Sequence, residues 1–86
     1  MSKLSDLPNI GTEVERQLHD AGITTEAELR AVGSREAWLR ILARDPSACV
    51  NRLYALEGAI RGLRWHSLDE GAKAELLAFY RKSKGT

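Results

Sequence analysis

Residues 49–64 read C-V-N-R-L-Y-A-L-E-G-A-I-R-G-L-R, and this stretch decides the predicted fold. Its apolar side chains recur after four, three, four and three positions, which is the period of an α-helix with one buried face. The residues of this stripe are Cys49, Leu53, Leu56, Ile60 and Leu63. We therefore expect a helix that ends near Arg64, is the longest of the chain and lies at the centre of the core. Leu53, Leu56 and Ile60 should be fully buried there.

Hydroxyl and carboxylate residues three positions apart mark further predicted helix starts. In such a capping box, the hydroxyl accepts a hydrogen bond from one backbone amide and the carboxylate accepts from another, so two otherwise unpaired donors are satisfied. The pairs are Thr12 with Glu15, Thr25 with Glu28, and Ser67 with Glu70. They predict helices that begin at these hydroxyl residues, the last of which carries Ala72, Leu76 and Phe79 on its apolar face.

Glycine, proline and serine residues complete the predicted boundaries. Gly22 and Gly33 should end the first two helices, because glycine adopts the positive φ that commonly follows a helix. Ser34 should cap a third helix that ends near Arg44. Asp45-Pro46 should then open the helix of the apolar stripe, since proline suits the first helical position.

No segment of five or more residues alternates between apolar and polar side chains, so we expect no β-sheet. The predicted fold class is all-α, a compact five-helix bundle in a single domain of residues 1–86. Its ordered core should cover about residues 4–81, and residues 82–86 should form a basic, frayed tail.

The charge balance is nearly even, with 13 basic and 12 acidic side chains among 86 residues. Residues 1–28 carry two basic and six acidic side chains, a net charge of −4, whereas residues 29–86 carry 11 basic and six acidic ones, a net charge of +5. The total of +1 is not the strongly basic balance typical of nucleic-acid-binding domains. The uneven distribution can still steer a charged partner towards the positive part of the chain.

Residues that could carry catalysis or bind metal are sparse. Cys49 is the single cysteine, which excludes an internal disulfide and a cysteine-based zinc site, and we expect it to be a small buried apolar residue. His19 and His66 lie 47 positions apart with no metal-ligand pattern joining them. No catalytic triad, acid pair or glycine-rich nucleotide loop is present. We therefore expect no enzymatic activity, cofactor, metal or small-molecule substrate.

Targeting and membrane segments are also missing from the sequence. Met1–Gly11, where a secretory leader would lie, has no apolar core segment. No apolar run approaches the roughly 18 residues of a membrane span. A cytoplasmic location without membrane contact is the expectation.

Leu7-Pro8-Asn9-Ile10-Gly11 precedes the first predicted helix and is a candidate phosphate site. A Pro-x-x-Gly turn that opens a helix directs free backbone amides outwards at the positive end of the helix dipole, where they can bind a phosphate. The segment and its following helices resemble the helix-hairpin-helix family of DNA-binding modules, which implies contact between the DNA backbone and Asn9, Ile10 and Gly11. Asn9 stands where that family has a glycine, and asparagine also tolerates left-handed φ. Acidic residues on both sides of the turn oppose a phosphate, so a purely structural turn is the alternative.

Residues 51–66 hold a second candidate surface. Gly58 and Gly62 lie one turn apart within the predicted helix, where each costs roughly 1 kcal/mol relative to alanine, so a close backbone approach is expected. With Tyr54 and Trp65 they form a candidate interaction face, because Tyr, Trp and Arg are enriched in interaction hot spots. Packing within the domain and contact with a second copy both remain open.

If the domain binds DNA, the electrostatic attraction must come from the positive part of the chain. The candidate phosphate contacts there are Arg52, Arg61, Arg64, Arg81 and Lys82. Few phosphates would be neutralised, and no helix carries the cluster of Arg, Asn and Gln that reads base edges. Binding should therefore be weak and independent of DNA sequence.

Three segments make the chain similar to a known family: L-P-N-I-G at 7–11, A-G-I-T-T at 21–25 with E-L-R following, and L-Y-A-L-E-G-A-I-R-G-L-R-W-H-S-L at 53–68. They resemble the C-terminal domain of the TfoX/Sxy family, bacterial regulators of DNA transformation competence, and the likeness covers nearly residues 4–81. The resemblance implies a five-helix bundle of the SAM-like or helix-hairpin-helix-like type and a role in competence regulation. The N-terminal domain of that family has no counterpart in these 86 residues.

Three functions remain open at this point. The first is a non-enzymatic regulatory domain that binds DNA weakly and non-specifically. The second is a protein–protein interaction module, such as a homodimer, without DNA binding. The third is a stand-alone domain that competes with a larger relative for its partner. A binding titration at two salt concentrations separates the first from the others, because phosphate contacts weaken with salt.

Overall fold

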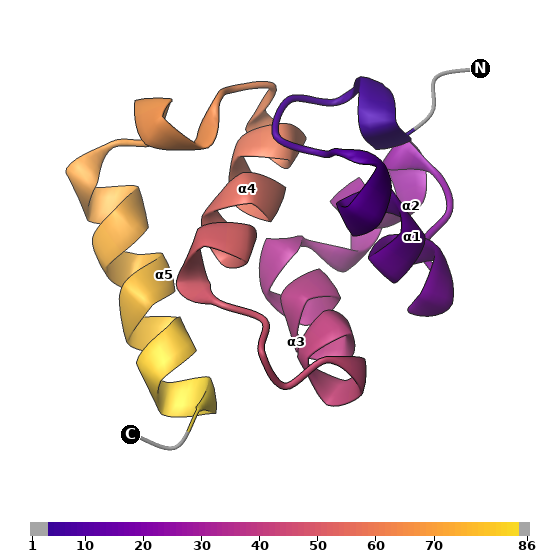
Figure 1. The fold of residues 1–86 in the computed structure, drawn as a ribbon. Coiled ribbons are helices and arrows are strands. Elements are labelled where there is room, and N and C mark those ends of the chain that lie inside the picture. Colours follow the sequence, from indigo (N-terminus) through magenta and orange to yellow (C-terminus); the bar gives the residue numbers. More distant parts are fainter. Residues whose placement is uncertain (1–3, 85–86) are drawn as a thin grey trace.

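Five α-helices and two short 3₁₀ helices make up the computed structural model, which describes residues 4–84 (Figure 1). In chain order they are η1 (Leu4–Asp6), α1 (Thr12–Asp20), α2 (Glu26–Val32), α3 (Ser34–Arg44), α4 (Val50–Arg61), η2 (Trp65–Ser67) and α5 (Glu70–Ser83). No strand occurs in residues 4–84, and the predicted all-α class with five helices is confirmed. Residues 85–86, the end of the predicted basic tail, lie outside the described residues.

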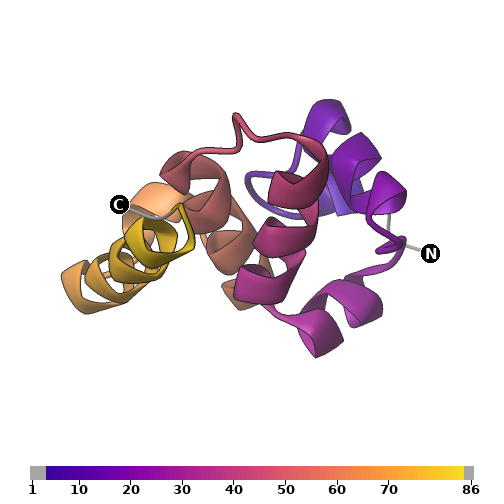
Figure 2. The same ribbon diagram turned by 90° about the horizontal axis from the view of Figure 1, so that it is seen from below.

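Helix α4 lies at the centre of the bundle, as predicted. It packs against α3, α5, η2 and α2, and Figures 1 and 2 show α5 on one side of it and the α1–α2 pair on the other. Helix α5 has 14 residues and α4 has 12, so the prediction that the central helix is the longest is wrong. None of the helices within residues 4–84 combines the length and apolar composition that crossing a membrane requires.

The buried face of α4 differs in part from the predicted stripe. Leu53 and Leu56 are fully buried, but Ile60 is only half-buried. Leu63 is 40% exposed, and it lies beyond the helix because Gly62, at φ +74°, ends α4. The remaining buried positions of α4 are filled by small residues, namely Ala55, Gly58 and Ala59. Small residues allow a neighbouring segment to approach the helix axis closely. These buried positions were not predicted, because the sequence pattern was built from the larger apolar side chains alone.

Trp38 occupies the middle of the core and corrects the prediction for Cys49. Its indole is fully buried and lies 5.6 Å from the ring of Tyr80 and 6.2 Å from that of Phe79, centroid to centroid. The indole Nε1 donates to the Cys49 carbonyl oxygen at 3.1 Å. Cys49 itself is exposed, because it precedes the first residue of α4 and its side chain lies outside the buried face.

One of the three predicted capping boxes is present. Thr25 and Glu28 form the reciprocal pair at the start of α2. At α1 the cap residue is Gly11, with no side-chain cap, and the Glu15 carboxylate accepts from the Ser5 amide at 3.0 Å instead. The Thr12 box is therefore wrong, because η1 supplies another donor to the glutamate.

The predicted box of Ser67 with Glu70 is also wrong. Ser67 belongs to η2, and Asp69 caps α5 by accepting from the Ala72 amide at 2.7 Å. A carboxylate directly before the helix makes the same bond that the hydroxyl was expected to make, so the start of α5 moves by two residues.

The starts of α3 and α4 require corrections too. Gly33, at φ +86°, precedes α3, and Ser34 lies in its first turn with its hydroxyl donating to Glu57 Oε1 at 2.5 Å. Asp45-Pro46 does not open α4, which begins at Val50. The Asp45 carboxylate instead accepts from the amide and hydroxyl of Ser47 and so stabilises the α3–α4 loop.

Glycine ends α1 and α2 as predicted. Gly22 has φ +85° and its amide donates to the His19 carbonyl, while the Ile23 amide donates to the Leu18 carbonyl. These two bonds form the Schellman motif. Ile23 and Leu18 are both fully buried, so the turn also carries an apolar residue into the core. Gly33, at φ +86°, ends α2 without that motif, and its amide donates to the Leu29 carbonyl at 2.8 Å.

Candidate nucleic-acid interface

The loop of residues 7–11 connects η1 to α1 and contains the predicted hairpin turn. Asn9 has φ +69°, the left-handed conformation expected at this position. The Ile10 amide donates to the Leu7 carbonyl at 3.3 Å, and the Ile10 side chain is 4% exposed. Gly11 is exposed and extended at the start of α1. Of the three residues predicted to contact DNA here, only Gly11 is exposed, whereas Asn9 is half-buried and Ile10 is buried.

The Asn9 side chain is occupied by hydrogen bonds to a distant part of the chain. Its Nδ2 donates to the carbonyl oxygens of Leu63 at 2.8 Å and Ala55 at 3.4 Å. Its Oδ1 accepts from the Trp65 amide at 3.0 Å. The loop is thereby fixed to the segment that follows α4.

An open hollow of about 580 Å³ lies beside this loop. It is lined by residues 5–11 and by Arg64, which is exposed and has no ion pair within the described part of the chain. Within residues 4–84, the amides of Thr12, Glu13 and Val14 donate to no backbone acceptor, as is usual for the first turn of a helix. Asp6 also lines the hollow, so the charge around it is mixed.

The other arginines predicted to bind DNA do not join this hollow. Arg61, in the last turn of α4, pairs with Glu57 at 2.6 Å. Arg52, in the first turn, pairs with Asp45 at 3.5 Å, whereas Arg64 follows the other end of α4. Arg81 and Lys82 lie in the last turn of α5. The predicted phosphate contacts therefore fall into two places, and only Arg64 lies beside the hairpin.

Glu57 is bound from two helices. It accepts from Ser34 at 2.5 Å and from Arg61 at 2.6 Å. Partial burial alone would raise the pKa of Glu57, but these hydrogen bonds and the charge of Arg61 outweigh burial and hold the pKa below its ordinary value. Glu57 and Arg61 form an i, i+4 pair on α4. The bond from Ser34 to Glu57 was missed in the sequence because Ser34 was assigned to a cap.

The predicted interaction face is only partly on the surface. The rings of Tyr54 and Trp65 are stacked at 6.2 Å with an interplanar angle of 13°, and Lys73 Nζ lies 5.7 Å from the centroid of the Trp65 ring. Gly62 is exposed, but Gly58 is buried beneath Asn9. The close backbone approach expected at Gly58 is thus made within the chain.

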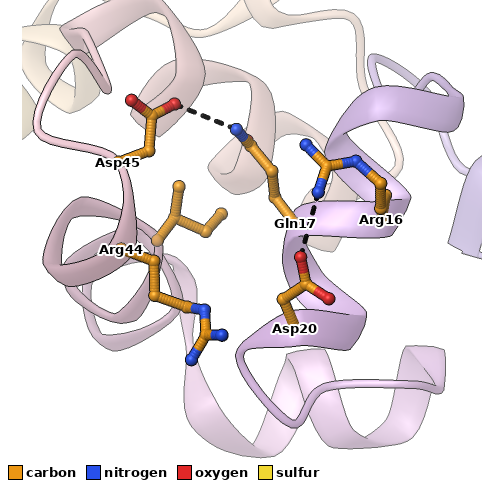
Figure 3. A pocket seen from close by; sticks show the side chains of 6 residues that line it. Arg16, Gln17, Asp20, Arg44 and Asp45 are labelled. Atoms are coloured by element: carbon orange, nitrogen blue, oxygen red, sulfur yellow. Dashed lines mark hydrogen bonds and ion pairs between the residues drawn. The ribbon is translucent and has the colours of Figure 1, made fainter.

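A second hollow, of about 310 Å³, lies between α1 and the end of α3 (Figure 3). It is lined by Arg16, Gln17, Asp20, Ile41, Arg44 and Asp45. Gln17 reaches across from α1, and its Nε2 donates to Asp45 Oδ2 at 3.0 Å. Its Oε1 is buried and accepts no hydrogen bond from any group of residues 4–84. A buried acceptor of this kind commonly binds a water molecule. Sequence reasoning missed this contact because 28 positions separate Gln17 from Asp45.

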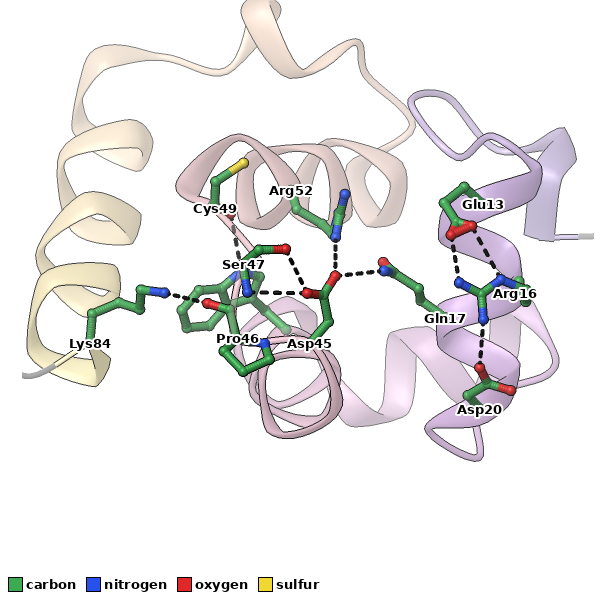
Figure 4. A network of polar contacts seen from close by, with 11 residues as sticks. Glu13, Arg16, Gln17, Asp20, Asp45, Pro46, Ser47, Cys49, Arg52 and Lys84 are labelled. Atoms are coloured by element: carbon green, nitrogen blue, oxygen red, sulfur yellow. Dashed lines mark hydrogen bonds and ion pairs between the residues drawn. The ribbon is translucent and has the colours of Figure 1, made fainter.

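Asp45 is the centre of a polar network that joins four helices (Figure 4). The hydrogen bond from the Ser47 hydroxyl, followed by those from the Ser47 amide and Gln17 and the charge of Arg52, lowers the pKa of Asp45. The same loop receives the Lys84 ammonium from the end of α5, at 2.7 Å from the Pro46 carbonyl oxygen. The network connects α1, α3, α4 and α5 around one loop. Residues 4–84 contain no cluster of His, Cys, Asp and Glu suited to a metal ion.

Comparison with known proteins places this geometry in a family. The model of the TfoX C-terminal domain matches residues 1–80. The chain is 34% identical over 74 residues to Protein Sxy of Escherichia coli strain K12, and 30% identical over 77 residues to the DNA transformation protein TfoX of Haemophilus influenzae. These matches cover 86% and 90% of this chain but 35% and 36% of the relatives, so the chain spans about a third of their length.

Two solved structures have the same fold. An uncharacterised protein from Listeria monocytogenes, in a triclinic crystal form, is 54% identical with a TM-score of 0.96 over 98% of this chain and 96% of that chain. A protein of unknown function from the same organism, in a tetragonal form, is 54% identical with a TM-score of 0.90 over 92% of this chain and 98% of that chain. With the family match over residues 1–80, these findings establish that the chain belongs to the TfoX C-terminal domain family.

Proposed function

We propose that this chain is a non-enzymatic regulatory domain that contacts the DNA backbone weakly and without sequence preference. Two relatives that it matches over about a third of their length are Protein Sxy and the DNA transformation protein TfoX. TfoX is named a DNA transformation protein, and a role of this chain in regulating that process is part of the proposal.

The observation that carries the proposal is the position of Arg64. Its guanidinium, which has no ion pair within residues 4–84, lines the same hollow as the hairpin loop and Gly11. The free amides at the start of α1 lie next to Gly11. A cation and unpaired amides at a helix start are together the groups that bind a single phosphate.

The same geometry supports a weak interaction. One unpaired arginine neutralises few phosphates, and Asp6 lines the hollow as well. With so few contacts, the dissociation constant should lie near the ~10⁻⁴–10⁻⁶ M of non-specific binding at physiological salt. No contact to base edges is part of the proposal, because no helix within residues 4–84 carries a suitable cluster of Arg, Asn and Gln side chains.

The test is fluorescence anisotropy with a short labelled duplex at several salt concentrations. Arg64→Ala should weaken binding roughly three- to tenfold and reduce the salt dependence by about one phosphate contact. Arg40→Ala is the matched control, since Arg40 is an exposed arginine on α3 that pairs with Glu36 and does not line the hollow. Absence of binding at low salt, or equal effects of the two substitutions, would contradict the proposal.

Homodimerisation without DNA binding is the second candidate function. It is favoured by the stacked Tyr54 and Trp65 rings and by Leu63, which is 40% exposed nearby in the chain. Tyr and Trp are enriched in interaction hot spots, and the exposed Leu63 side chain adds apolar surface to the same stretch of chain. Sedimentation velocity over a concentration range tests it. A dimer that Leu63→Glu converts to a monomer would support this function, whereas a monomer at every concentration would exclude it.

A further inference from the structure

We infer that Asn9 is a positioning residue. Together with Gly58 it locks the 7–11 loop to the turn after α4, and through this lock it holds Arg64 at the rim of the hollow. The inference rests on the proposed contact between Arg64 and a phosphate and adds a residue that acts on it indirectly. It also assigns the Asn9 side chain a role within the protein and not as a ligand of DNA.

Both polar groups of the Asn9 side-chain amide make hydrogen bonds, and only one orientation of the amide satisfies them. Nδ2 donates to two carbonyl oxygens, of Leu63 and Ala55, and Oδ1 accepts from the Trp65 amide. Carbonyl oxygens only accept and a backbone amide only donates, so a flipped side chain would break all these bonds. The partners lie 46 to 56 positions from Asn9 in the sequence.

Gly58 is the residue that leaves space for this side chain. A Cβ atom at position 58 would lie 2.6 Å from Asn9 Nδ2 and 2.7 Å from the Leu63 carbonyl oxygen. Gly62 completes the arrangement, because its φ of +74° turns the chain so that the Leu63 amide donates back to the Gly58 carbonyl at 2.8 Å. The Leu63 carbonyl then lies beside Asn9.

Arg64 lies between the two residues that Asn9 binds after α4. The Leu63 carbonyl before it and the Trp65 amide after it are both fixed by the same side chain. The Arg64 carbonyl in turn accepts from the Ser67 amide at 2.9 Å. The backbone of Arg64 is therefore held against the loop whose hollow its side chain lines.

Asn9→Gly tests the hydrogen bonds of the lock separately from the conformation of the turn. Glycine adopts positive φ without strain, so the hairpin conformation is kept while all the side-chain bonds are lost. If the lock exists, the Trp65 amide loses its acceptor and should exchange with solvent about tenfold faster. The Ile23 amide, which donates to the Leu18 carbonyl, should keep its exchange rate. Unchanged exchange at Trp65 would overturn the lock.

Gly58→Ala tests the same lock from the other partner. The added methyl group must displace the Asn9 side chain, so the Trp65 amide should again exchange faster while the Ile23 amide keeps its rate. This variant keeps the inference testable should Asn9→Gly fail to fold by circular dichroism. Protection at Trp65 equal to that of the wild type would again contradict the lock.

A double-mutant cycle on duplex DNA at low salt tests the positioning of Arg64. Asn9→Gly should weaken binding roughly three- to tenfold in the presence of Arg64 and have no further effect in the Arg64→Ala background. Effects that simply add would show that Asn9 acts independently of Arg64 and would overturn the positioning role. A wild-type protein that binds no duplex would refute the proposed function and with it this role, while exchange at Trp65 would still decide whether the lock exists.

Discussion

A methyl group at Gly58 would meet backbone, whereas one at Gly71 would not. The nearest atoms to a Cβ at Gly58 include the Leu63 carbonyl oxygen at 2.7 Å, which cannot move without opening the turn at Gly62. At Gly71, in the first turn of α5, the nearest atom is Asp69 Oδ1 at 3.6 Å, an ordinary contact. Both glycines lie in helices, but only Gly58 is required by a close approach of a neighbouring segment.

Gly58→Ala should therefore lower the free energy of unfolding by about 1–3 kcal/mol, the usual cost of overpacking. This cost exceeds the roughly 1 kcal/mol that alanine gains over glycine within a helix. Gly71→Ala, the matched control, should be neutral or stabilise by up to about 1 kcal/mol. Urea unfolding of both variants measures the difference, and a Gly58→Ala protein as stable as wild type would show that the contact is loose.

At the scale of elements, the position at which α4 ends determines which of its apolar residues are buried. Gly62 ends the helix before Leu63, so two leucines of the predicted stripe have different environments. Leu56→Ala should cost about 2–5 kcal/mol, because its side chain is fully buried. Leu63→Ala should change stability by no more than about 0.5 kcal/mol, since Leu63 is 40% exposed. Thermal melts by circular dichroism compare the two, and similar losses would place Leu63 within the core.

The boundaries of the elements also explain which features the sequence could predict. Helix ends at Gly22 and Gly33 were correct, because positive φ is a local property of glycine. The caps at Thr12 and Ser67 were wrong, because nearby groups compete for the same partners and only the folded chain decides among them. The Ser5 amide, for example, takes the carboxylate that Thr12 was expected to share.

Part of the candidate site could also be predicted from the sequence, and part could not. The hairpin loop follows from Pro8 and Gly11, and Arg64 stands out as a basic residue of the positive half. The partners of Asn9 could not be found, because its hydrogen bonds go to backbone atoms, which have no residue signature in a sequence. Gly58 and Gly62 were the visible signals of a close approach, without indicating which segment approaches, and only Gly58 makes one.

At the scale of the whole molecule, the network around Asp45 should make stability depend on acid. The folded pKa of Asp45 lies below its unfolded value of about 3.9, chiefly because of the hydrogen bond from the Ser47 hydroxyl. The ionised carboxylate therefore stabilises the fold above about pH 4, and this contribution is lost as the pH falls through the folded pKa. Glu13, Glu28 and Glu57 have lowered pKa values too and act in the same direction.

The free energy of unfolding should consequently decrease as the pH is lowered below about 4, and it should decrease less in Asp45→Asn. Asparagine keeps an acceptor for Ser47 but is not protonated in this pH range. The substitution therefore removes only the contribution of Asp45 to the acid dependence of the unfolding free energy. Urea unfolding at a series of pH values measures the dependence. An identical acid dependence in the variant would mean that the network does not contribute.

The hydrogen bonds of Asn9 also determine when the hairpin can complete its folding during synthesis of the chain. A ribosome adds roughly 5–20 residues per second, and the Trp65 amide follows Asn9 by 56 positions. The nascent hairpin therefore waits about 3–11 seconds for its last partner at that rate, whereas α1 and its glycine stop need only neighbours within a few residues. Until residue 65 leaves the exit tunnel, the rim of the hollow does not exist, and the newly made N-terminal half has no means of holding a phosphate beside Arg64.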